Sequence, residues 1–487
     1  AMAQSPFPTL STEQEKAPPT ASPKEKPTVA PPEGQPQETS YFPSYNRSNA
    51  PTVLKSQGSS IPSGPFRPSS EPSYTKSLFP FVDTPPISPS IPFASNPSFM
   101  PSVYMPMWKE VGESIIGKDE GDTLGRSIAM SDDGMILAVG IYLPDLDTEQ
   151  NTGKVRVFRL EKNNSWKQIG QDIVGIAAGD QAGRSVDLSS DGSVVAVGSK
   201  DMVQVFVYDR DYNFWYPLGR QQLTGDINDV FFGVSISLSN DGMVLMVAAD
   251  VDNGDGKDSG KVQIFHYSQF FNEWNQLGQT FHGDIPVEAI SLNGEGDIAA
   301  LGVPNITATG ITNAGLVRVY ERTTILTSTS WIPRGTTLRE DEIGFGSSVD
   351  LSKDGMTLAI SSKYGVHLYQ FDTKIWDWIK INAKIHVEIE NTTDIQNEIC
   401  VSLSPNGRTL AVSAMSSSSE TVQVYKFNED DSQWLTLGHV IKNSETEAGP
   451  APSISLNSNT QIAVGFVQFG SEEDMNLGKV QVYELWE

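Results

Sequence analysis

A tryptophan motif that returns at intervals along the chain constrains the fold more than any other feature. Six segments follow the pattern Trp-x-x-apolar-Gly or a close variant, and each closes a larger repeat. They begin at Trp166, Trp215, Trp274, Trp331, Trp376 and Trp434. A seventh copy begins at Trp108, before the first repeat, whereas the last repeat stops at Glu487 without its own copy. A chain that begins with the segment its last repeat lacks is arranged to close a ring.

Each repeat carries three further strand-like segments ahead of its tryptophan. In the second repeat, Ser185-Val-Asp-Leu-Ser precedes an Asp-Gly pair, and the apolar run Val194-Val-Ala-Val follows it. Asp-Gly supplies the positive φ angles of a tight hairpin. A third segment, Val203-Gln-Val-Phe-Val, comes next. The turn position recurs at Gly134, Gly192, Gly242, Gly296, Gly355, Gly407 and Asn459. Four short antiparallel strands repeated seven times predict an all-β, seven-bladed β-propeller.

The two ends of the repeat region are expected to meet. We predict that residues 108–116 pair with Val480–Tyr483 as the outer strand of the last blade. Such pairing closes the ring with backbone hydrogen bonds and removes two free sheet edges. The repeated tryptophans are expected to fill the gaps between adjacent blades near the rim, since large aromatic side chains prefer cores.

The composition divides the chain near residue 106. Residues 1–106 contain 23 of the 31 prolines, and their seven acidic and seven basic residues cancel. Sequence rich in Pro and Ser with few apolar runs cannot bury enough surface to offset its ordering entropy. We therefore predict a disordered Pro/Ser-rich arm over 1–106, preceding a propeller over 107–487. Ala1-Met2-Ala3 is typical of a cloning remnant, which leaves room for a targeting segment before Gln4.

One part of the predicted arm differs from the rest. Residues 78–108 have Asp83 as their only charge before Trp108, and aromatic side chains are interspersed among their prolines. This segment could dock on the propeller, bind a partner, or hold copies of the chain together in a structural layer. A sticky but disordered linker is the alternative.

The motifs of common enzyme classes are missing. The sequence has no Gly-x-Ser-x-Gly, His-Glu-x-x-His or phosphate-binding glycine-rich loop, and its single cysteine excludes a disulfide framework. No stretch is long enough to span a membrane as a helix. The formal charge of −26 belongs entirely to the propeller. Nucleic acid is disfavoured as a partner, because its phosphates carry the same sign.

One loop has the composition of a calcium site. Residues 250–258 place four carboxylates and two glycines within nine residues. The candidate metal ligands are Asp250, Asp252, Asp255 and Asp258. Calcium needs several oxygens from a loop that can fold around it. The spacing does not match an EF-hand, and a solvated acidic loop tip is the alternative.

Acidic residues also gather in the loops that a propeller brings to one face. The connections between the second and third strands and those between blades emerge on the same side of the ring. The candidate partner-binding residues there are Asp145, Asp147, Glu149, Asp226, Asp229, Glu340, Asp341 and Glu342. Concentrated carboxylates create a negative potential that steers cations and basic partners. The alternative is that these charges serve solubility alone.

The repeat unit resembles a known family. The unit Phe-Gly-x-Ser-Val-x-Leu-Ser-x-Asp-Gly, followed by Gly-x-Val-x-Val-Tyr and Trp-x-x-Leu-Gly, is similar to the FG-GAP-like propeller repeats of diatoms and related algae. More distantly it resembles the propeller of integrin α chains. The resemblance covers about residues 108–487 and implies a propeller that binds a ligand or partner, often outside the cell. Integrin-type calcium loops lie in the first hairpin, which here is a short turn, so no calcium ligand carries over by position.

These observations favour a non-enzymatic binding or scaffolding propeller that is secreted or at the cell surface. Its acidic loop face would bind a basic protein partner or calcium, and the arm would act as a tether. Two alternatives stay open. One is a hydrolase that uses paired carboxylates near the central channel. The other is a self-assembling structural layer protein. An enzyme requires a few carboxylates that converge in one pocket with displaced pKa values, whereas a binding face spreads them over the rim.

Overall fold

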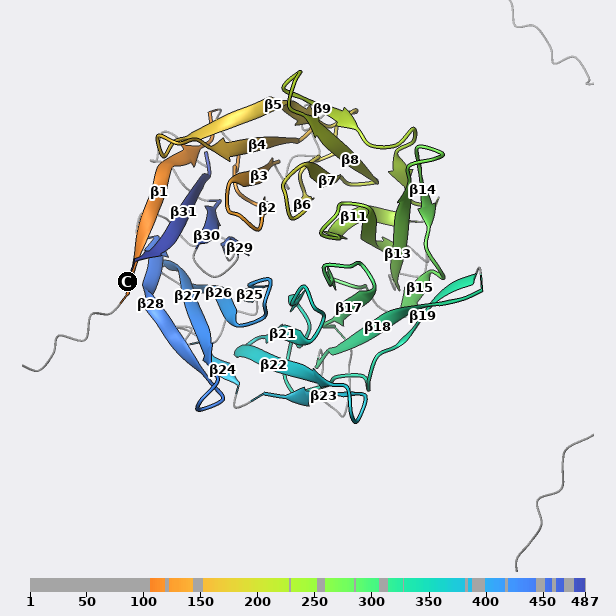
Figure 1. Ribbon diagram of the computed structural model, residues 1–487, viewed down its shortest axis with the longest axis vertical. Helices are drawn as coiled ribbons and strands as arrows, with labels where there is room; N and C mark the ends of the chain where they lie inside the picture. The colour runs from red at the N-terminus through yellow and green to blue at the C-terminus, as the bar shows by residue number, and fades with distance from the viewer. Residues whose placement is uncertain are drawn as a thin grey trace, which may run out of the picture. The chain divides into compact units, whose positions relative to one another are not determined.

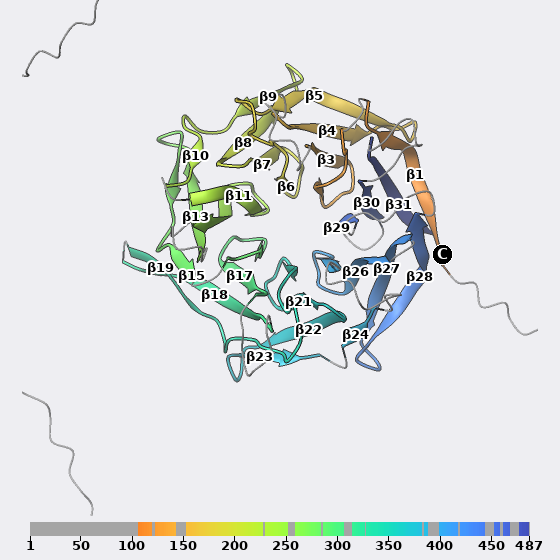
Figure 2. The same cartoon turned by 180° about the vertical axis from the view of Figure 1, so that it is seen from behind.

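The described strands form seven antiparallel sheets, arranged as blades around a central axis (Figures 1 and 2). The computed structural model describes residues 106–118, 122–142, 152–226, 229–251, 259–283, 286–305, 314–326, 328–381, 384–387, 399–416, 419–443, 452–457, 461–467 and 477–486. The predicted all-β, seven-bladed propeller is confirmed. The predicted arm lies outside the described residues, except for Pro106. Within those residues, no helix is long and apolar enough to cross a membrane.

In each blade the first strand lies nearest the axis and the fourth lies at the perimeter (Figure 1). Blade 1 consists of β2 (Ile128–Met130), β3 (Ile136–Ile141), β4 (Lys154–Leu160) and β5 (Trp166–Val174). Blade 2 consists of β6 (Ser185–Leu188), β7 (Val194–Gly198), β8 (Met202–Asp209), β9 (Phe214–Pro217) and β10 (Leu223–Thr224). Blade 3 consists of β11 (Asp229–Leu238), β12 (Val244–Val251), β13 (Ser259–Ser268), β14 (Glu273–Gln276) and β15 (Phe281–Gly283). Blade 4 consists of β16 (Ala289–Leu292), β17 (Ile298–Val303), β18 (Leu316–Ile325) and β19 (Ser328–Pro333).

The remaining three blades complete the ring. Blade 5 consists of β20 (Val349–Leu351), β21 (Thr357–Ser362), β22 (Gly365–Asp372), β23 (Asp377–Lys380) and β24 (Ile385–His386). Blade 6 consists of β25 (Ile399–Leu403), β26 (Thr409–Ser416), β27 (Ser419–Asn428) and β28 (Gln433–Asn443). Blade 7 consists of β29 (Ser453–Leu456), β30 (Gln461–Phe466), β31 (Lys479–Trp486) and β1 (Met107–Ile116). In blades 2, 3 and 5 the perimeter strand is split into two short pieces, both paired with the third strand.

The Ser-x-Asp-Gly motif of the first hairpin is explained by its own hydrogen bonds. In blade 2 the Ser189 hydroxyl donates to the Asp191 carboxylate at 2.8 Å and accepts the Val194 amide at 2.9 Å. Gly192 completes the turn with a φ of 66°. Turns of this kind use side-chain oxygens to satisfy backbone donors and glycine to reach positive φ. The second strand that follows, Val194–Gly198, is buried throughout because neighbouring blades cover both of its faces.

Tryptophans link six of the seven blades to the blade before them. In these six the indole Nε1 donates to a carbonyl of the preceding blade at 2.8–3.3 Å, whereas Nε1 of Trp434 in blade 6 has no hydrogen-bond partner among the described residues. The residues concerned are Trp108, Trp166, Trp215, Trp274, Trp331 and Trp378. The predicted packing between blades is therefore confirmed, with one correction in blade 5. There Trp378, not Trp376, takes the buried position. The hairpin has the same four-residue loop as blades 2, 3 and 6, in which the tryptophan is the second residue after the loop, and Trp376 is the last residue of the loop itself.

In every blade except blade 6, the indole packs on the glycine that ends the preceding motif. A Cβ on Gly170, whose φ is +69°, would lie 2.4 Å from Cδ1 of Trp215. We expect Gly170→Ala to lower the free energy of unfolding by roughly 1–2 kcal/mol for the left-handed backbone and by roughly 1–3 kcal/mol more for the clash. Chemical denaturation of both proteins measures the loss.

Gly179→Ala is the matched control for this variant. Gly179 also has positive φ, at +83°, but a Cβ there would meet nothing within 4 Å. The control is expected to show only the backbone cost. Equal losses in the two variants would contradict a packing role for the glycine beneath the indole.

The first strand of the propeller closes the ring, as predicted. β1 pairs antiparallel with β31, from Met107 opposite Trp486 to Ile116 opposite Lys479. Within β1, Trp108, Val111 and Ile115 are buried. β1 also takes part in two contacts between blades, because Trp108 packs on Gly438 of blade 6 and Trp166 of blade 1 packs on Gly112. The strand is thus a full structural member of blade 7.

Candidate functional site: the axial channel and the acidic loop face

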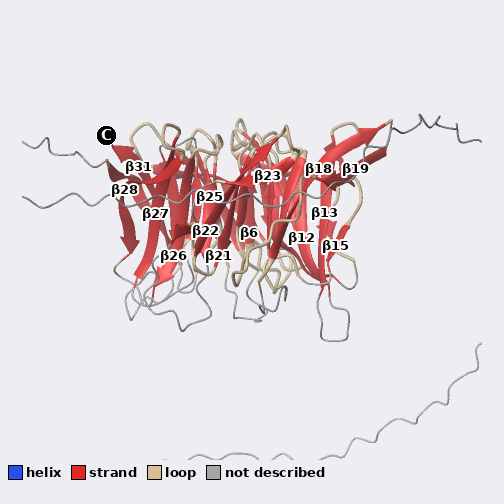
Figure 3. Cartoon of the chain, turned by 90° about the horizontal axis from the view of Figure 1, so that it is seen from below, coloured by secondary structure: helices blue, strands red, loops and turns tan. Residues whose placement is uncertain are grey.

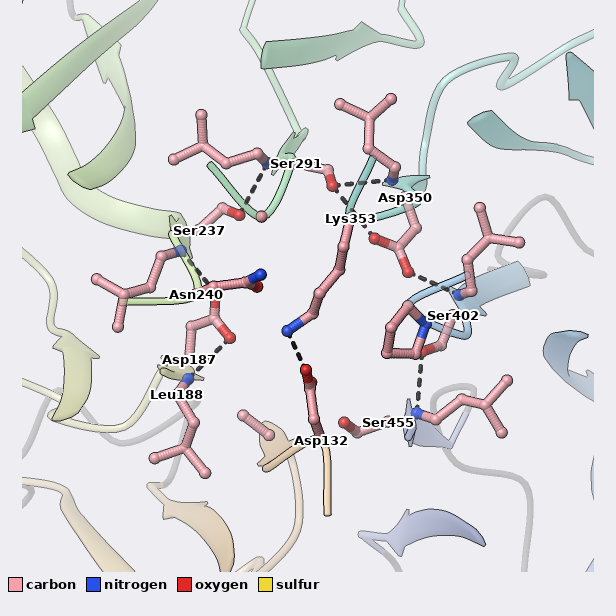
Figure 4. A pocket seen from close by; sticks show the side chains of 18 of the residues that line it. Asp132, Asp187, Leu188, Ser237, Asn240, Ser291, Asp350, Lys353, Ser402 and Ser455 are labelled. Carbon is pink, nitrogen blue, oxygen red and sulfur yellow. Dashed lines mark hydrogen bonds and ion pairs between the residues drawn. The ribbon is translucent and has the colours of Figure 1, made fainter. Parts of the chain in front are cut away.

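A small polar cavity of about 200 Å³ lies on the propeller axis (Figure 4). One residue from the first strand of each blade lines it at the same height. These are Ala129, Asp187, Ser237, Ser291, Asp350, Ser402 and Ser455. The sequence pattern explains the arrangement, because alternate residues of a strand face the same way and this position falls between two apolar neighbours in every repeat.

These side chains bind each blade to the next. Their oxygens accept the backbone amides of Leu238, Leu292, Leu351, Leu403, Leu456 and Met130, in blade order, at 2.7–3.1 Å. The pattern breaks only at Ala129, which has no side-chain oxygen. The Leu188 amide of blade 2 donates at 2.8 Å to Asp187 of its own strand instead. Asp187 thus satisfies two amides, one with each carboxylate oxygen.

One end of the cavity is crossed by a lysine. The Nζ of Lys353 lies 2.6 Å from a carboxylate oxygen of Asp132 on the opposite side of the ring (Figure 4). Backbone hydrogen bonds of 2.8–3.0 Å also link the hairpins at this end, running from Asp132 through Ser190, Asn240, Gly294 and Lys353 to Pro405. This end of the channel is therefore narrowed by side chains and by backbone.

Two of the three aspartates that line the cavity, Asp187 and Asp350, have raised pKa values. Both are partly buried in the cavity wall, and the loss of solvation there raises the pKa of Asp187 to about 6 and that of Asp350 to about 7. The proximity of Asp187 adds to the increase at Asp350, because two like charges in one enclosed space oppose each other. Neither aspartate was among the predicted site residues. The sequence held a signal, since blades 2 and 5 have Asp where four other blades have Ser.

The acidic loop face lies at the other end of the ring. The second strands end and the third strands begin at the lower side in Figure 3, whereas the β18–β19 hairpin lies at the upper side. Two predicted partner-binding residues there, Asp226 and Asp229, contact Lys261 at 2.6 and 2.5 Å. Lys261 and Asp229 are buried, whereas 83% of the Asp226 side chain is exposed. Asp229 therefore serves the fold, while Asp226 still faces solvent.

Glu340 and Glu342 belong to a second charged cluster on this face. Glu340 contacts Lys380 at 2.5 Å and accepts the Tyr369 hydroxyl at 2.6 Å. Burial alone would raise the pKa of Glu342, but Lys384, Ser362 and His367 together hold it at about 2. Burial lowers the pKa of His367, which lies 3.2 Å from Glu342. Asp341, between the two glutamates, is exposed.

Most of the predicted metal loop lies outside the described residues. Asp252, Asp255 and Asp258 are not described, and neither are Asp145, Asp147 and Glu149 of the predicted partner-binding set. Asp250 lies one residue before the end of β12, opposite Gly260 in β13. Among the residues that the structure describes, no group of three or more His, Cys, Asp or Glu side chains is placed to hold a metal ion. The calcium site therefore stays a prediction.

Fold and channel together define a seven-bladed β-propeller with a narrow polar axis. No family model and no curated protein matches the sequence. Similar solved structures include two provisional 6-phosphogluconolactonases, from Bacteroides fragilis and Bacteroides uniformis, and a functionally unknown protein from Desulfotomaculum acetoxidans. Their identities are 13, 14 and 12%, with TM-scores of 0.43, 0.41 and 0.42. The matches cover 66, 65 and 68% of this chain and 85, 85 and 99% of those chains. Likenesses this distant carry no argument about activity.

Proposed function

We propose that this chain is a non-enzymatic binding propeller whose acidic loop face binds a basic protein partner. The observation that carries the proposal is an imbalance of charge at that face. The segments 119–121, 143–151, 252–258, 284–285, 388–398, 444–451 and 468–476 join strand ends there. Together they contain eighteen acidic residues and one lysine, Lys257. A surface of one sign steers oppositely charged partners and raises their association rates.

Four lysines of this face are paired within the folded blades. Lys154 contacts Asp122 at 3.1 Å, and Lys261 contacts both Asp226 and Asp229. Lys380 contacts Glu340, and Lys384 contacts Glu342. These lysines are already paired with acidic residues of the folded blades. On this proposal, the charge of the connecting segments attracts a cation from outside the chain. Calcium, held by Asp250, Asp252, Asp255 and Asp258, is the other cation that this face would take.

The proposal also covers the protein family to which the chain is related and its location in or outside the cell. The repeat unit supports a relation to the FG-GAP-like propellers, and its Phe-Gly pairs have a clear physical role. Phe232 and Phe345 are buried, and the glycines after them have φ of 105° and 98°. On this basis we propose a protein of the cell surface or extracellular matrix, with residues 1–106 as its tether.

Neutralising one acidic loop is expected to weaken the binding of a basic peptide. The triple variant Asp145→Asn, Asp147→Asn, Glu149→Gln removes three negative charges from the loop face. We expect at least a threefold rise in the Kd for fluorescent oligolysine at low ionic strength, and a smaller difference at high salt, because screening weakens such attraction. Fluorescence anisotropy measures both.

The chain offers a control with the same change of charge. Glu429→Gln, Asp430→Asn, Asp431→Asn removes three charges from the β27–β28 hairpin, at the opposite end of the ring. It is expected to affect the Kd less than the loop variant. Equal effects would show a response to net charge alone and would contradict a binding face. A rise in Tm with calcium that chelator reverses and Asp252→Ala abolishes would instead favour calcium as the ligand.

A second candidate function rests on the axial cavity. Asp187 and Asp350 converge there with raised pKa values, as the acid–base pair of a hydrolase would. Two observations weigh against it. Both carboxylates accept backbone amides that hold neighbouring blades together, and about 200 Å³ is less than the volume of most ligand pockets. Hydrolysis of chromogenic glycosides that Asp350→Asn abolishes would restore this candidate.

A further inference from the structure

Four consecutive blades expose large apolar side chains at the tips of their outer hairpins. These hairpins join the third and fourth strands of blades 2 to 5. We call the following residues the apolar tips: Tyr212, Phe214, Phe270, Phe271, Ile325, Leu326, Ile375 and Trp376. Leu326 is 97% exposed and Phe270 is 88% exposed. The same hairpins of blades 1 and 6 carry polar residues, Glu161–Asn164 and Glu429–Ser432.

Two of the apolar tips occupy a backbone position that does not suit them. The outer hairpin has a left-handed residue in each of blades 1 to 6, with φ between 49° and 59°. It is Asn164, Asn213 and Asn272 in blades 1 to 3, then Leu326, Trp376 and Ser432. Asparagine tolerates this conformation, whereas bulky apolar residues rarely adopt it. Leu326 and Trp376 thus oppose both the turn geometry and the preference of apolar groups for the interior.

Folding alone does not account for these two residues. Trp376 keeps a partial contact, because its ring lies 5.3 Å from that of Phe371 and the Arg334 guanidinium lies 5.6 Å from it. About half of its surface is nevertheless exposed, and Leu326 is almost fully exposed. Sequence choices that break local rules at exposed positions are expected where a surface makes contact with something else.

The charges around the apolar tips differ from those of the rest of the propeller. In the hairpins of blades 4 and 5, Arg322 and Lys374 balance Asp372 and Asp377. Blades 2 and 3 add Arg210 against Asp209, Asp211 and Glu273, so the four hairpins carry three basic and five acidic residues. The longer acidic loops connect strands at the opposite end of the ring (Figure 3). The hairpins that carry the tips are therefore only weakly acidic, whereas the connecting segments at the other end contain eighteen acidic residues and one lysine.

We propose that the apolar tips insert into the interfacial region of a lipid bilayer. The tips belong to separate hairpins, so a folded partner would need a recess for each, whereas a fluid surface accepts each one independently. Tyr and Trp prefer the level of the headgroups, and apolar side chains reach the acyl boundary below. Lys374 lies in the same hairpin loop as Ile375 and Trp376, where a cation can contact headgroup phosphates. This inference does not depend on the proposed function of the acidic face.

The experiment compares the full chain with the double variant Leu326→Asn, Trp376→Asn in sedimentation with phosphatidylcholine vesicles. Asparagine is what blades 1 to 3 carry at this position, so the variant is expected to fold with an unchanged or higher Tm. Its partition coefficient onto vesicles is expected to fall at least tenfold. Ser432→Asn, at the equivalent position of blade 6, is the control and should bind as the unmodified chain does.

Several results would overturn the proposal. The unmodified chain would fail to sediment with vesicles, or the double variant would bind equally well. Binding restricted to vesicles that contain phosphatidylserine, lost in salt and insensitive to the double variant, would assign the interaction to basic residues elsewhere. An oligomer of the unmodified chain that the double variant dissociates, without vesicle binding by either, would make the tips an interface between copies.

Discussion

Removal of residues 107–117 is expected to destabilise the entire propeller, although these residues form only one of its outer strands. The deletion takes away β1, and with it the buried side chains of Trp108, Val111 and Ile115. Burying each such side chain contributes roughly 1.5–3 kcal/mol, so the loss is about 5 kcal/mol or more. It also removes the glycine on which Trp166 packs and the carbonyl to which its indole donates. Thermal unfolding of the truncated chain should show a clearly lower Tm.

The effect of closure can be separated from that of shortening the chain. A protein that begins at Pro106 retains β1 and is expected to melt like the full chain. If the protein that lacks residues 107–117 does not fold, Trp108→Ala in the full chain provides a milder test. It removes a side chain that is 6% exposed and is expected to cost about 3–5 kcal/mol. An unchanged Tm in both the deletion and the point variant would contradict closure by β1.

The second large effect concerns pH. The pKa of Asp350 is raised to about 7 and that of Asp187 to about 6, against an ordinary value of 3.8. The folded protein therefore keeps these protons at pH values where the unfolded chain has released them. Stability that is fully present below about pH 4 is lost as the pH rises to about 7, by roughly 1.4 kcal/mol per pH unit for each group. Urea denaturation from pH 4 to pH 8 measures this slope.

Asp350→Asn is expected to remove its share of the slope. Asparagine retains an oxygen for the Leu403 amide, which now donates to Asp350 at 2.7 Å, and it carries no charge. We expect the variant to equal the unmodified protein near pH 4 and to exceed its stability at pH 8 by up to roughly 4 kcal/mol. Adding Asp187→Asn should flatten the profile further. An identical slope in the variant and the unmodified protein would contradict the raised pKa of Asp350.

The architecture was predictable because its determinants are local and repeated. Asp191 and Gly192 make the hairpin within a few residues, and Trp215 recurs in register with them. Even the closing strand followed from a missing copy of the motif. The error at Trp376 has a physical reason. Trp376 and Trp378 are two residues apart, so they fit the pattern equally well, and only their position relative to the hairpin loop decides which one is buried.

The channel was harder to foresee. Asp187 and Asp350 are 163 residues apart, and each lies in a short segment that resembles an ordinary inner strand. Ring closure alone brings them to one cavity. The pairing of Asp229 with Lys261 shows the same limit on the loop face. The sequence indicated where this acid would lie, but its partner is the residue before Val262 at the start of a strand, and no local pattern joins the two.

The pairing of β1 with β31 also determines when the ring can close during protein synthesis. Synthesis runs from the amino end, so β1 is made before any blade, while β31 is the last described strand. Until β31 is made, β1 lacks its partner strand, whereas the six intermediate blades can form in turn. A prematurely terminated chain would expose Trp108, Val111 and Ile115 to chaperones and proteases. The apolar face of β1 therefore stays exposed until β31 has been synthesised and pairs with it.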